Sequence, residues 1–230
     1  MTKTGDLPNP NDYIITRKRK LYKFAAFKNL PNCFTDDTWS EQRATFLNQP
    51  GQLVVEVGAG SGLFLTELAK RHSDQKFIAI DRKSDRLYKG AKLANELGLT
   101  NIIYLWSNAR NLAALLPADS VTSLWLTFPD PWPQESNIKH RLTNQHYLKQ
   151  YYRLLVSGGQ LNFKTDNLPL FTWSLDQIDK KNWQIVIVTN NLHQDKQINT
   201  LNDALVMTSY EQRYVNEDKT INYLLAIKNS

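Results

Sequence analysis

The stretch LVVEVGAGSG, residues 53–62, decides the fold of this chain. Its first half, LVVEV, has the apolar, β-branched composition of a buried strand and runs directly into the glycines of GAGSG. A helical pattern, LFLTELAKR, follows the glycines, and a second apolar run, FIAI, stops at Asp81 about twenty residues later. A strand, a glycine turn, a helix and a second strand that ends in an acid predict a pocket for a nucleotide-type cofactor.

Strand-like and helical patterns alternate over the rest of the chain. Before the glycine stretch, WSEQRATFLNQ predicts a helix from Trp39, with Ser40 as a candidate cap and Pro50 and Gly51 as its end. After it, the alternating runs are FIAI, SDRLYKGAKLANEL, IIYLW, VTSLWLTF, QHYLKQYYRLL, QLNFKT, LFTWSLDQI, WQIVIVT and INYLLAI. This alternation predicts an α/β fold with a largely parallel sheet and helices on both faces.

The glycine turn favours one class of cofactor. Gly58, Gly60 and Gly62 let a ligand approach the backbone, with a helix N-terminus behind them. Position 63 is Leu, so the pattern is GxGxG and not the GxGxxG of dinucleotide enzymes, and acidic Glu56 precedes it. A carboxylate would attract the ammonium of a methionine-derived sulfonium cofactor and repel phosphates. The glycine spacing alone leaves a functional loop and an ordinary turn equally open.

Polar residues at the ends of the next two strands fit the same pocket. Asp81 is placed to accept both ribose hydroxyls of an adenosine moiety. The alternative is a helix cap, because SDRLYKGAK follows at once, but the spacing from the glycines favours the ribose role. After IIYLW, the Asn108 amide, next to Ala109, is placed to hydrogen-bond an adenine edge.

The stretch FPDPWP, residues 128–133, predicts a rigid site for a nucleic acid base. Pro129 and Pro131 fix their own backbone angles, so Asp130 and Trp132 are held in a non-helical presentation. An acid beside an aromatic ring is typical of base binding. For Trp132, stacking on a base and capping the core are equally open.

Taken together, five motifs resemble the bacterial tRNA (guanine-N7)-methyltransferase family. They are VEVGAGSG (55–62), FPDPWP (128–133), HRL (140–142), KTDN (164–167) and TSYE (208–211), in the family's order, and the resemblance runs from Leu53 to the C-terminus. It implies a Rossmann-like class I methyltransferase fold with a mostly parallel seven-stranded sheet. It also implies transfer of a methyl group from S-adenosylmethionine to N7 of guanine 46 in the variable loop of tRNA.

The resemblance carries residue roles over to the matching positions. Asp130 is the expected catalytic centre. The expected cofactor contacts are Glu56, Gly58, Gly60, Gly62, Asp81, Asn108, Ala109 and Asp130. The expected substrate contacts are Gln134, Lys139, His140, Arg141, Asp166, Thr208, Tyr210 and Glu211. Lys164 lies within a predicted strand, on the opposite side from Thr165, and we assign it no role.

Two positions depart from the family pattern. Asn108 stands where the family often has Asp, which keeps an acceptor, adds donors and loses the charge. Gln134 stands where the family has Lys, and QESNIKHRL keeps only Lys139, His140 and Arg141 of a segment that is usually dense in Lys and Arg. Fewer phosphate contacts would weaken RNA affinity and flatten its salt dependence.

A basic segment near the N-terminus offers compensation for that loss. We expect residues 1–36 to form a basic, partly flexible arm and residues 37–230 to form the methyltransferase domain. Between Arg17 and Lys28, basic residues are interleaved with Tyr22, Phe24 and Phe27. The charges suit phosphates, and the rings either stack on bases or anchor the arm to the domain, two interpretations that are equally open.

The amino-acid composition indicates which partners, metals and cellular location to expect. Lys and Arg number 28 against 22 Asp and Glu, a net charge of +6 that suits a polyanionic partner, and the resemblance implies that this partner is tRNA. The single cysteine, Cys33, excludes an internal disulfide and a cysteine-rich zinc site, and His72, His146 and His193 show no metal-site spacing. Without an apolar signal or spanning segment, we expect a soluble cytoplasmic protein with no membrane or metal partner, either monomer or homodimer.

Two other functions stay open at this stage. A catalytically weak RNA-binding protein could keep the fold, although the intact acids Glu56, Asp81, Asp130 and Asp166 argue against it. A methyltransferase that acts on another substrate is supported only by Gln134 and the thinned basic segment. Cofactor binding tests the first alternative, and the identity of the product tests the second.

Overall fold

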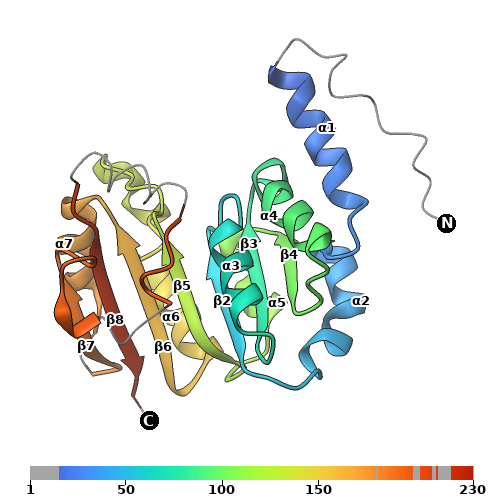
Figure 1. The fold of residues 1–230 in the computed structure, drawn as a ribbon. Coiled ribbons are helices and arrows are strands. Elements are labelled where there is room, and N and C mark those ends of the chain that lie inside the picture. The colour runs from blue at the N-terminus through green and yellow to red at the C-terminus, as the bar shows by residue number, and fades with distance from the viewer. Residues whose placement is uncertain (1–15, 180, 199–202, 209–210, 212–218, 230) are drawn as a thin grey trace.

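The computed structural model describes residues 16–179, 181–198, 203–208, 211 and 219–229, without the side chains of residues 16–21 and 197. Its strands form one sheet in the order β1-β4-β3-β2-β5-β6-β8-β7 (Figure 1). The strands are β1 (Cys33–Thr35), β2 (Leu53–Val57), β3 (Lys76–Asp81), β4 (Ile102–Trp106), β5 (Val121–Thr127), β6 (Leu155–Thr165), β7 (Trp183–Thr189) and β8 (Asn222–Lys228).

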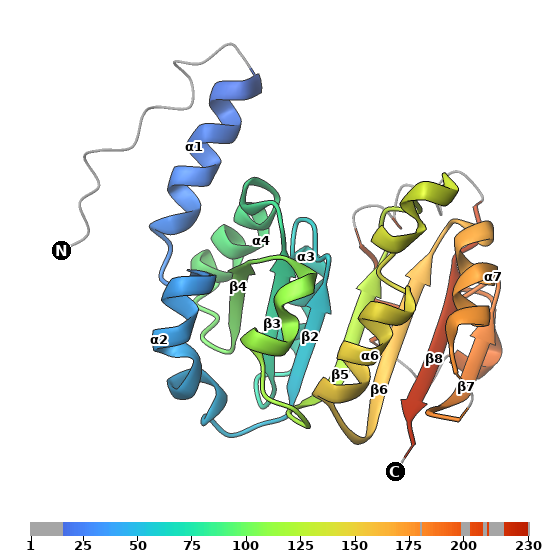
Figure 2. The same cartoon turned by 180° about the vertical axis from the view of Figure 1, so that it is seen from behind.

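Two layers of helices enclose this sheet. The α-helices are α1 (Thr16–Lys28), α2 (Asp36–Leu47), α3 (Leu63–Arg71), α4 (Ser84–Glu96), α5 (Leu112–Leu115), α6 (Gln145–Leu154) and α7 (Leu168–Gln177), and the short 3₁₀ turns are η2 (Ala109–Asn111), η3 (Glu135–His140) and η4 (Lys196–Ile198). Helices α3 and α4 lie over one face, and α5, α6 and α7 lie over the other (Figures 1 and 2). The predicted α/β fold with helices on both faces is confirmed.

The sheet is parallel except at one end. Every neighbouring pair from β1 to β6 is parallel, whereas β8 runs antiparallel to both β6 and β7. Chain order runs outward in opposite directions on the two sides of β2, toward β3 and β4 on one side and toward β5 and β6 on the other. Such a switch point opens a crevice at the carboxyl ends of the strands, and ligands of open α/β sheets collect there.

The central strands are apolar at most positions because both faces of the sheet are covered. In β3, Phe77 and Ala79 belong to the core cluster under α3 and α4, whereas Ile78 and Ile80 belong to the cluster under α5 and α6. The neighbouring strand β4 divides in the same way, with Ile102 and Tyr104 on the first side. This period of two places the two hydrophobic layers on opposite faces of one strand.

Two details of the predicted fold were wrong. The sheet has eight strands and not seven, because the three-residue β1 adds a parallel edge to β4. Helix α2 begins earlier than predicted, and its cap is Thr35, whose side chain and that of Thr38 each accept from the other's backbone amide. Ser40, the predicted cap, lies inside the helix and donates to the Asp37 carbonyl.

The described part of the predicted basic arm, residues 16–36, joins the domain through the helix α1 and the edge strand β1. Phe27 of α1 is fully buried, the Tyr22 ring meets the Tyr88 ring of α4 at 6.5 Å, and the Phe24 ring meets the Trp106 ring of β4 at 4.9 Å. The anchoring interpretation of these aromatic residues is therefore confirmed. Within the described residues, no helix is both long and apolar enough to cross a membrane.

Candidate active site

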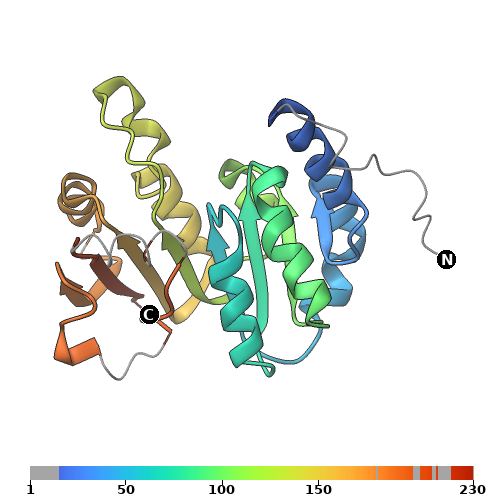
Figure 3. The same cartoon turned by 45° about the horizontal axis from the view of Figure 1, so that its top comes forward.

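A pocket of about 630 Å³ opens at the carboxyl ends of β2, β3, β4, β5 and β6. Figure 3 turns this edge of the sheet toward the reader. The lining comes from the loops that follow these strands, and Thr208 of the chain between β7 and β8 joins them. A pocket of this size is typical of a site for a small molecule or cofactor.

The glycine turn after β2 forms the floor of the pocket. Gly58, Gly60 and Gly62 all have positive φ, at 75°, 55° and 69°, a region that side chains with a Cβ rarely adopt. A Cβ added to Gly62 would lie 2.7 Å from the Tyr104 ring, whereas a Cβ added to Gly60 would meet nothing within 4 Å. The turn therefore packs tightly on the protein side and stays open on the pocket side.

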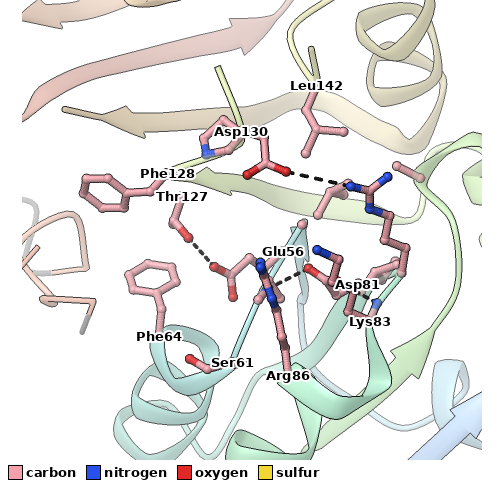
Figure 4. A pocket seen from close by; sticks show the side chains of 18 of the residues that line it. Glu56, Ser61, Phe64, Asp81, Lys83, Arg86, Thr127, Phe128, Asp130 and Leu142 are labelled. Atoms are coloured by element: carbon pink, nitrogen blue, oxygen red, sulfur yellow. Dashed lines mark hydrogen bonds and ion pairs between the residues drawn. The ribbon is translucent and has the colours of Figure 1, made fainter. Parts of the chain in front are cut away.

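Glu56, at the end of β2, is a fully buried acid that lines the pocket. Figure 4 shows its carboxyl group beside Thr127, whose hydroxyl donates to Oε1 at 2.5 Å. The other oxygen, Oε2, is buried and has no hydrogen-bond partner in the described part of the chain. Burial raises the pKa of Glu56 to about 8, against the opposing effect of the Thr127 bond. An unpaired buried acceptor of this kind is suited to a cationic donor from a ligand.

Asp81, at the end of β3, ties two loops of the pocket together. Its Oδ2 accepts from the Gly60 amide at 2.9 Å and its Oδ1 accepts from the Lys83 amide at 2.8 Å. Burial raises the pKa of this carboxyl, although the two amides oppose the shift. The residue is thus held against the glycine turn, and each carboxylate oxygen keeps a second acceptor position for a ligand hydroxyl.

The loop after β4 brings three more residues to the pocket. The Asn108 side-chain oxygen accepts from the Arg110 amide at 3.0 Å and caps η2, which leaves the amide NH₂ as its remaining polar group. Ala109 lines the pocket next to it. Ser107 also lines the pocket, and its buried hydroxyl has no hydrogen-bond partner among the described residues.

The PDPWP loop forms one wall of the mouth. Phe128 and Trp132 have positive φ, at 48° and 42°, so the backbone is strained on both sides of Asp130. The side chain of Asp130 is 64% exposed, and its Oδ2 lies 3.9 Å from an Arg82 guanidinium nitrogen (Figure 4). Trp132 lies at the mouth, with its ring 5.3 Å from the ring of His140.

Arg141 stabilises the PDPWP loop by hydrogen bonds to its backbone. Its guanidinium donates to the backbone carbonyls of Pro131 and Trp132, at 2.9 Å from Nε and 3.1 Å from Nη2, and it lies 4.5 Å from the centre of the Trp173 ring. The residue is buried. These hydrogen bonds use Nε and one N–H of Nη2, two of the five guanidinium donors, and the predicted contact of Arg141 with the substrate stays a prediction.

The other predicted substrate residues differ in where they lie relative to the pocket. His140, Asp166 and Thr208 line the pocket, whereas Gln134 and Lys139 lie on exposed parts of the loop outside it. Glu211 is fully buried beside Lys164. Tyr210 falls outside the described residues.

Sequence reasoning missed a set of cations around the mouth. Four basic residues line the pocket, namely Arg82 and Lys83 in the loop after β3, Arg86 in the first turn of α4 and Arg110 in η2. The Arg110 guanidinium also lies 3.4 Å from a ring nitrogen of His140. The sequence signal for Arg82, Lys83 and Arg110 was that each comes within a few residues of a predicted strand end, as Asp81 and Asn108 do.

The donor set fits one cofactor chemistry. An acid pair at the ends of β2 and β3, a glycine turn open toward the pocket and an unpaired buried carboxylate oxygen match an adenosine group that carries a cationic amino acid. No cluster of three acids, histidines or cysteines that could hold a metal ion occurs in the described residues. The fold and the pocket define a class I methyltransferase that depends on S-adenosylmethionine.

Solved structures share this fold. The 16S rRNA methyltransferase KamB is similar with a TM-score of 0.63 and 17% identity, over 83% of this chain and 94% of that chain. A SAM-dependent methyltransferase from Aquifex aeolicus is similar with a TM-score of 0.53 and 15% identity, over 82% of this chain and 88% of that chain. A family model described as "Putative methyltransferase" matches residues 50–224.

Relatives with higher sequence identity show the family to which this chain belongs. Three proteins named tRNA (guanine-N(7)-)-methyltransferase are similar to this chain. The one from Mesomycoplasma hyopneumoniae strain 232 is 35% identical over 76% of this chain and 84% of its own length. The one from Brevibacillus brevis is 33% identical over 87% and 90%, and the one from Cytophaga hutchinsonii is 31% identical over 90% and 96%. The chain belongs to the bacterial tRNA (guanine-N7)-methyltransferase family.

Proposed function

We propose that this protein transfers the methyl group of S-adenosylmethionine to N7 of a guanine in the variable loop of tRNA, with Asp130 as its catalytic residue. The position of Asp130 is the main support for this proposal. Asp130 is an exposed acid between Pro129 and Pro131, on a strained loop at the mouth of the cofactor pocket. We also propose the cytoplasm as its location, because the proposed substrate is tRNA.

Methylation of guanine N7 depends mainly on how the protein positions the two reactants. N7 carries an in-plane lone pair and no proton, so its methylation requires no general base. S-adenosylmethionine supplies an electrophilic methyl group, and transfer moves one positive charge from sulfur to the base. Holding two reactants in line is worth about 7 to 11 kcal/mol relative to a bimolecular encounter.

Five pocket residues share the positioning of the two reactants. Glu56 and Asp81 hold the cofactor, through its ammonium and its ribose hydroxyls. Asp130 and Asp166 bind the donor edge of guanine, at N1 and N2, and Asp130 stabilises the positive charge that develops on the base. Trp132 is placed at the mouth to cover the base.

The basic rim of the pocket suits the tRNA backbone. Arg82, Lys83, Arg86 and Arg110 are charges that phosphates flanking the target nucleotide would meet. Arg110 lies 3.4 Å from His140 of the thinned segment after PDPWP, and Arg82 lies 3.9 Å from Asp130, so these cations adjoin that segment. This arrangement supports tRNA as the substrate despite Gln134.

The test is nucleoside mass spectrometry on unmodified tRNA incubated with protein and S-adenosylmethionine. We expect 7-methylguanosine with wild type and at least a 100-fold lower rate with Asp130→Asn, roughly the loss caused by removing one electrostatic contact to a transition state. Glu135→Gln, an exposed acid on the same loop outside the pocket, is the matched control and should keep full activity.

Cofactor binding must be measured alongside by calorimetry. If wild type binds S-adenosylmethionine and makes a different methylated nucleoside, the substrate assignment fails. If Asp130→Asn keeps wild-type activity, the catalytic assignment fails and the family activity stands.

A further inference from the structure

Lys164 of β6 is a fully buried lysine that the proposed reaction does not use. Its Nζ donates to the backbone carbonyls of Ala204 at 2.9 Å and Val206 at 3.0 Å, and it forms an ion pair with Glu211 Oε2 at 2.8 Å. An ammonium has three N–H donors, so these contacts use all of them. A buried charge with every donor used holds its partners in one arrangement.

All three partners belong to the chain between β7 and β8. Ala204 and Val206 are buried in the core cluster that contains Phe64, Trp125 and Tyr223, so this segment covers the sheet face beside α3. Residues 203–208 form turns and irregular backbone rather than a helix or strand. Carbonyls of buried irregular backbone need other partners, and Lys164 supplies them.

Glu211 completes the arrangement from the other side. Its Oε2 accepts from the Thr208 amide at 3.2 Å, and the Thr208 hydroxyl accepts from the Glu211 amide at 3.0 Å. His193 Nε2 lies 2.9 Å from Oε1, although the contact is not aligned as a hydrogen bond. Burial raises the pKa of Glu211, but His193 and Lys164 outweigh burial, so its pKa is lowered. Burial also lowers the pKa of Lys164, and the neighbouring Glu211 carboxylate opposes that shift.

The same lysine also touches the other side of the pocket. Its backbone carbonyl accepts from the Phe128 amide at 2.8 Å, at the strained residue that begins FPDPWP. Its Nζ lies 5.2 Å from the centre of the Phe64 ring, and Phe64 lines the pocket. Lys164 therefore contacts the residue before the PDPWP loop through its backbone, and Ala204, Val206 and Glu211 through its side chain.

We propose that Lys164 and Glu211 are positioning residues that form a buried clamp and fix Thr208 in the wall of the active site. Thr208 is the member of this group that lines the pocket. Glu211 acts through Thr208 and not by touching the substrate, because both of its oxygens face His193, Lys164 and the Thr208 amide. The effect on catalysis rests on the proposed function; the clamp itself does not.

Hydrogen exchange of the free protein tests the clamp independently of any substrate. In Lys164→Met, the described amides of residues 203–208 should exchange at least 10-fold faster, because the carbonyls of Ala204 and Val206 no longer have their donor. Glu211→Gln, a milder change of equal size, should act in the same direction. Leu161→Ala, a buried change on the opposite face of the same strand, is the control for reduced stability and should leave this segment protected.

A double-mutant cycle tests the effect on catalysis. If Lys164 acts through Thr208, Lys164→Met should lower kcat by about 10- to 100-fold, the loss expected from a small misplacement of a reacting group. Adding Thr208→Ala to Lys164→Met should then lower it no further. Non-additivity of this kind is the sign that two residues act as one unit.

The outcomes separate the two proposals. Unchanged exchange in Lys164→Met, multiplicative losses in the double mutant, or an equal loss of kcat in Leu161→Ala would each overturn the clamp. An increase in the KM for tRNA in Glu211→Gln, without faster exchange, would return Glu211 to the substrate contacts. Failure of wild type to form 7-methylguanosine would count against the proposed function alone, because the exchange data would still report the clamp.

Discussion

Glu56 makes cofactor binding depend on pH at the scale of one residue. Its pKa is raised to about 8 by burial, so near pH 7 the carboxyl group of the free protein is mostly protonated. A ligand ammonium beside Oε2 favours the ionised form, and binding should therefore release close to one proton. Between about pH 6 and 7.5, the affinity for S-adenosylmethionine should rise by up to about tenfold per pH unit.

Calorimetry in buffers of different ionisation enthalpy measures this proton directly. Glu56→Gln should bind more weakly, release no proton and show no such rise with pH. The raised pKa of Glu56 also makes the free energy of unfolding depend on pH. The stabilisation that the protonated Glu56 contributes is complete below the pKa of the unfolded chain and is lost as the pH rises through about 8. Equal proton release by wild type and Glu56→Gln would show that another group is responsible.

At the scale of elements, α4 holds the glycine turn in place through Gly90. The Gly90 amide donates to the Ser61 carbonyl at 2.9 Å. A Cβ on this residue would lie 2.6 Å from that carbonyl oxygen and 2.9 Å from the Gly62 carbonyl carbon. Gly90→Ala should lower the free energy of unfolding by about 1 to 3 kcal/mol, offset in part by the better helix propensity of Ala, and should weaken cofactor binding.

Gly98→Ala is the matched control for this prediction. Gly98 has a φ of 67° and open space where a Cβ would lie, so Ala there adds backbone strain without touching the pocket. Thermal unfolding and calorimetric titration of both variants give the comparison. Wild-type cofactor affinity in Gly90→Ala would contradict the coupling of α4 to the glycine turn.

The regular elements were predictable because their period and composition are visible in the sequence. The run WQIVIVT coincides with β7, and the acid at the end of FIAI does line the pocket. Three-residue β1 was missed, because CFT is too short to show a period. The Thr35 cap was missed because its partner is Thr38, which is outside the usual Glu or Gln signature.

The clamp could not be predicted, for a physical reason. Strand alternation indicates which face Lys164 occupies, but not what covers that face. The covering segment carries no helical or strand period, so its path across the sheet depends on contacts between residues far apart in sequence. The sequence alone therefore assigns the lysine no role, although its side chain is fully buried.

At the scale of the whole molecule, the net charge of +6 has to be reconciled with the thinned segment after PDPWP. We expect the α1 segment to supply missing phosphate contacts. Replacing Arg17, Lys18, Arg19 and Lys20 by Gln should weaken tRNA binding and reduce the slope of log affinity against log salt by about 0.7 to 0.9 for each phosphate that the protein no longer neutralises.

Binding measured across a salt series tests this expectation. The control replaces an equal number of exposed basic residues away from the pocket, namely Lys70, Arg71, Lys149 and Lys181. If both quadruple variants show the same slope, the α1 charges act only through net charge. If the α1 variant binds as wild type does, the arm has no part in tRNA recognition.

The order of β6, β8 and β7 in the sheet has a consequence for synthesis on the ribosome. β7 leaves the ribosome before β8, yet β8 is its partner in the sheet and also covers the edge of β6. Until residues 222–228 emerge, β6 and β7 each lack the neighbour with which they pair in the finished sheet. Exposed edges of this kind invite pairing with other chains, so the nascent protein is most open to aggregation, and most in need of a chaperone, in the interval between these two strands.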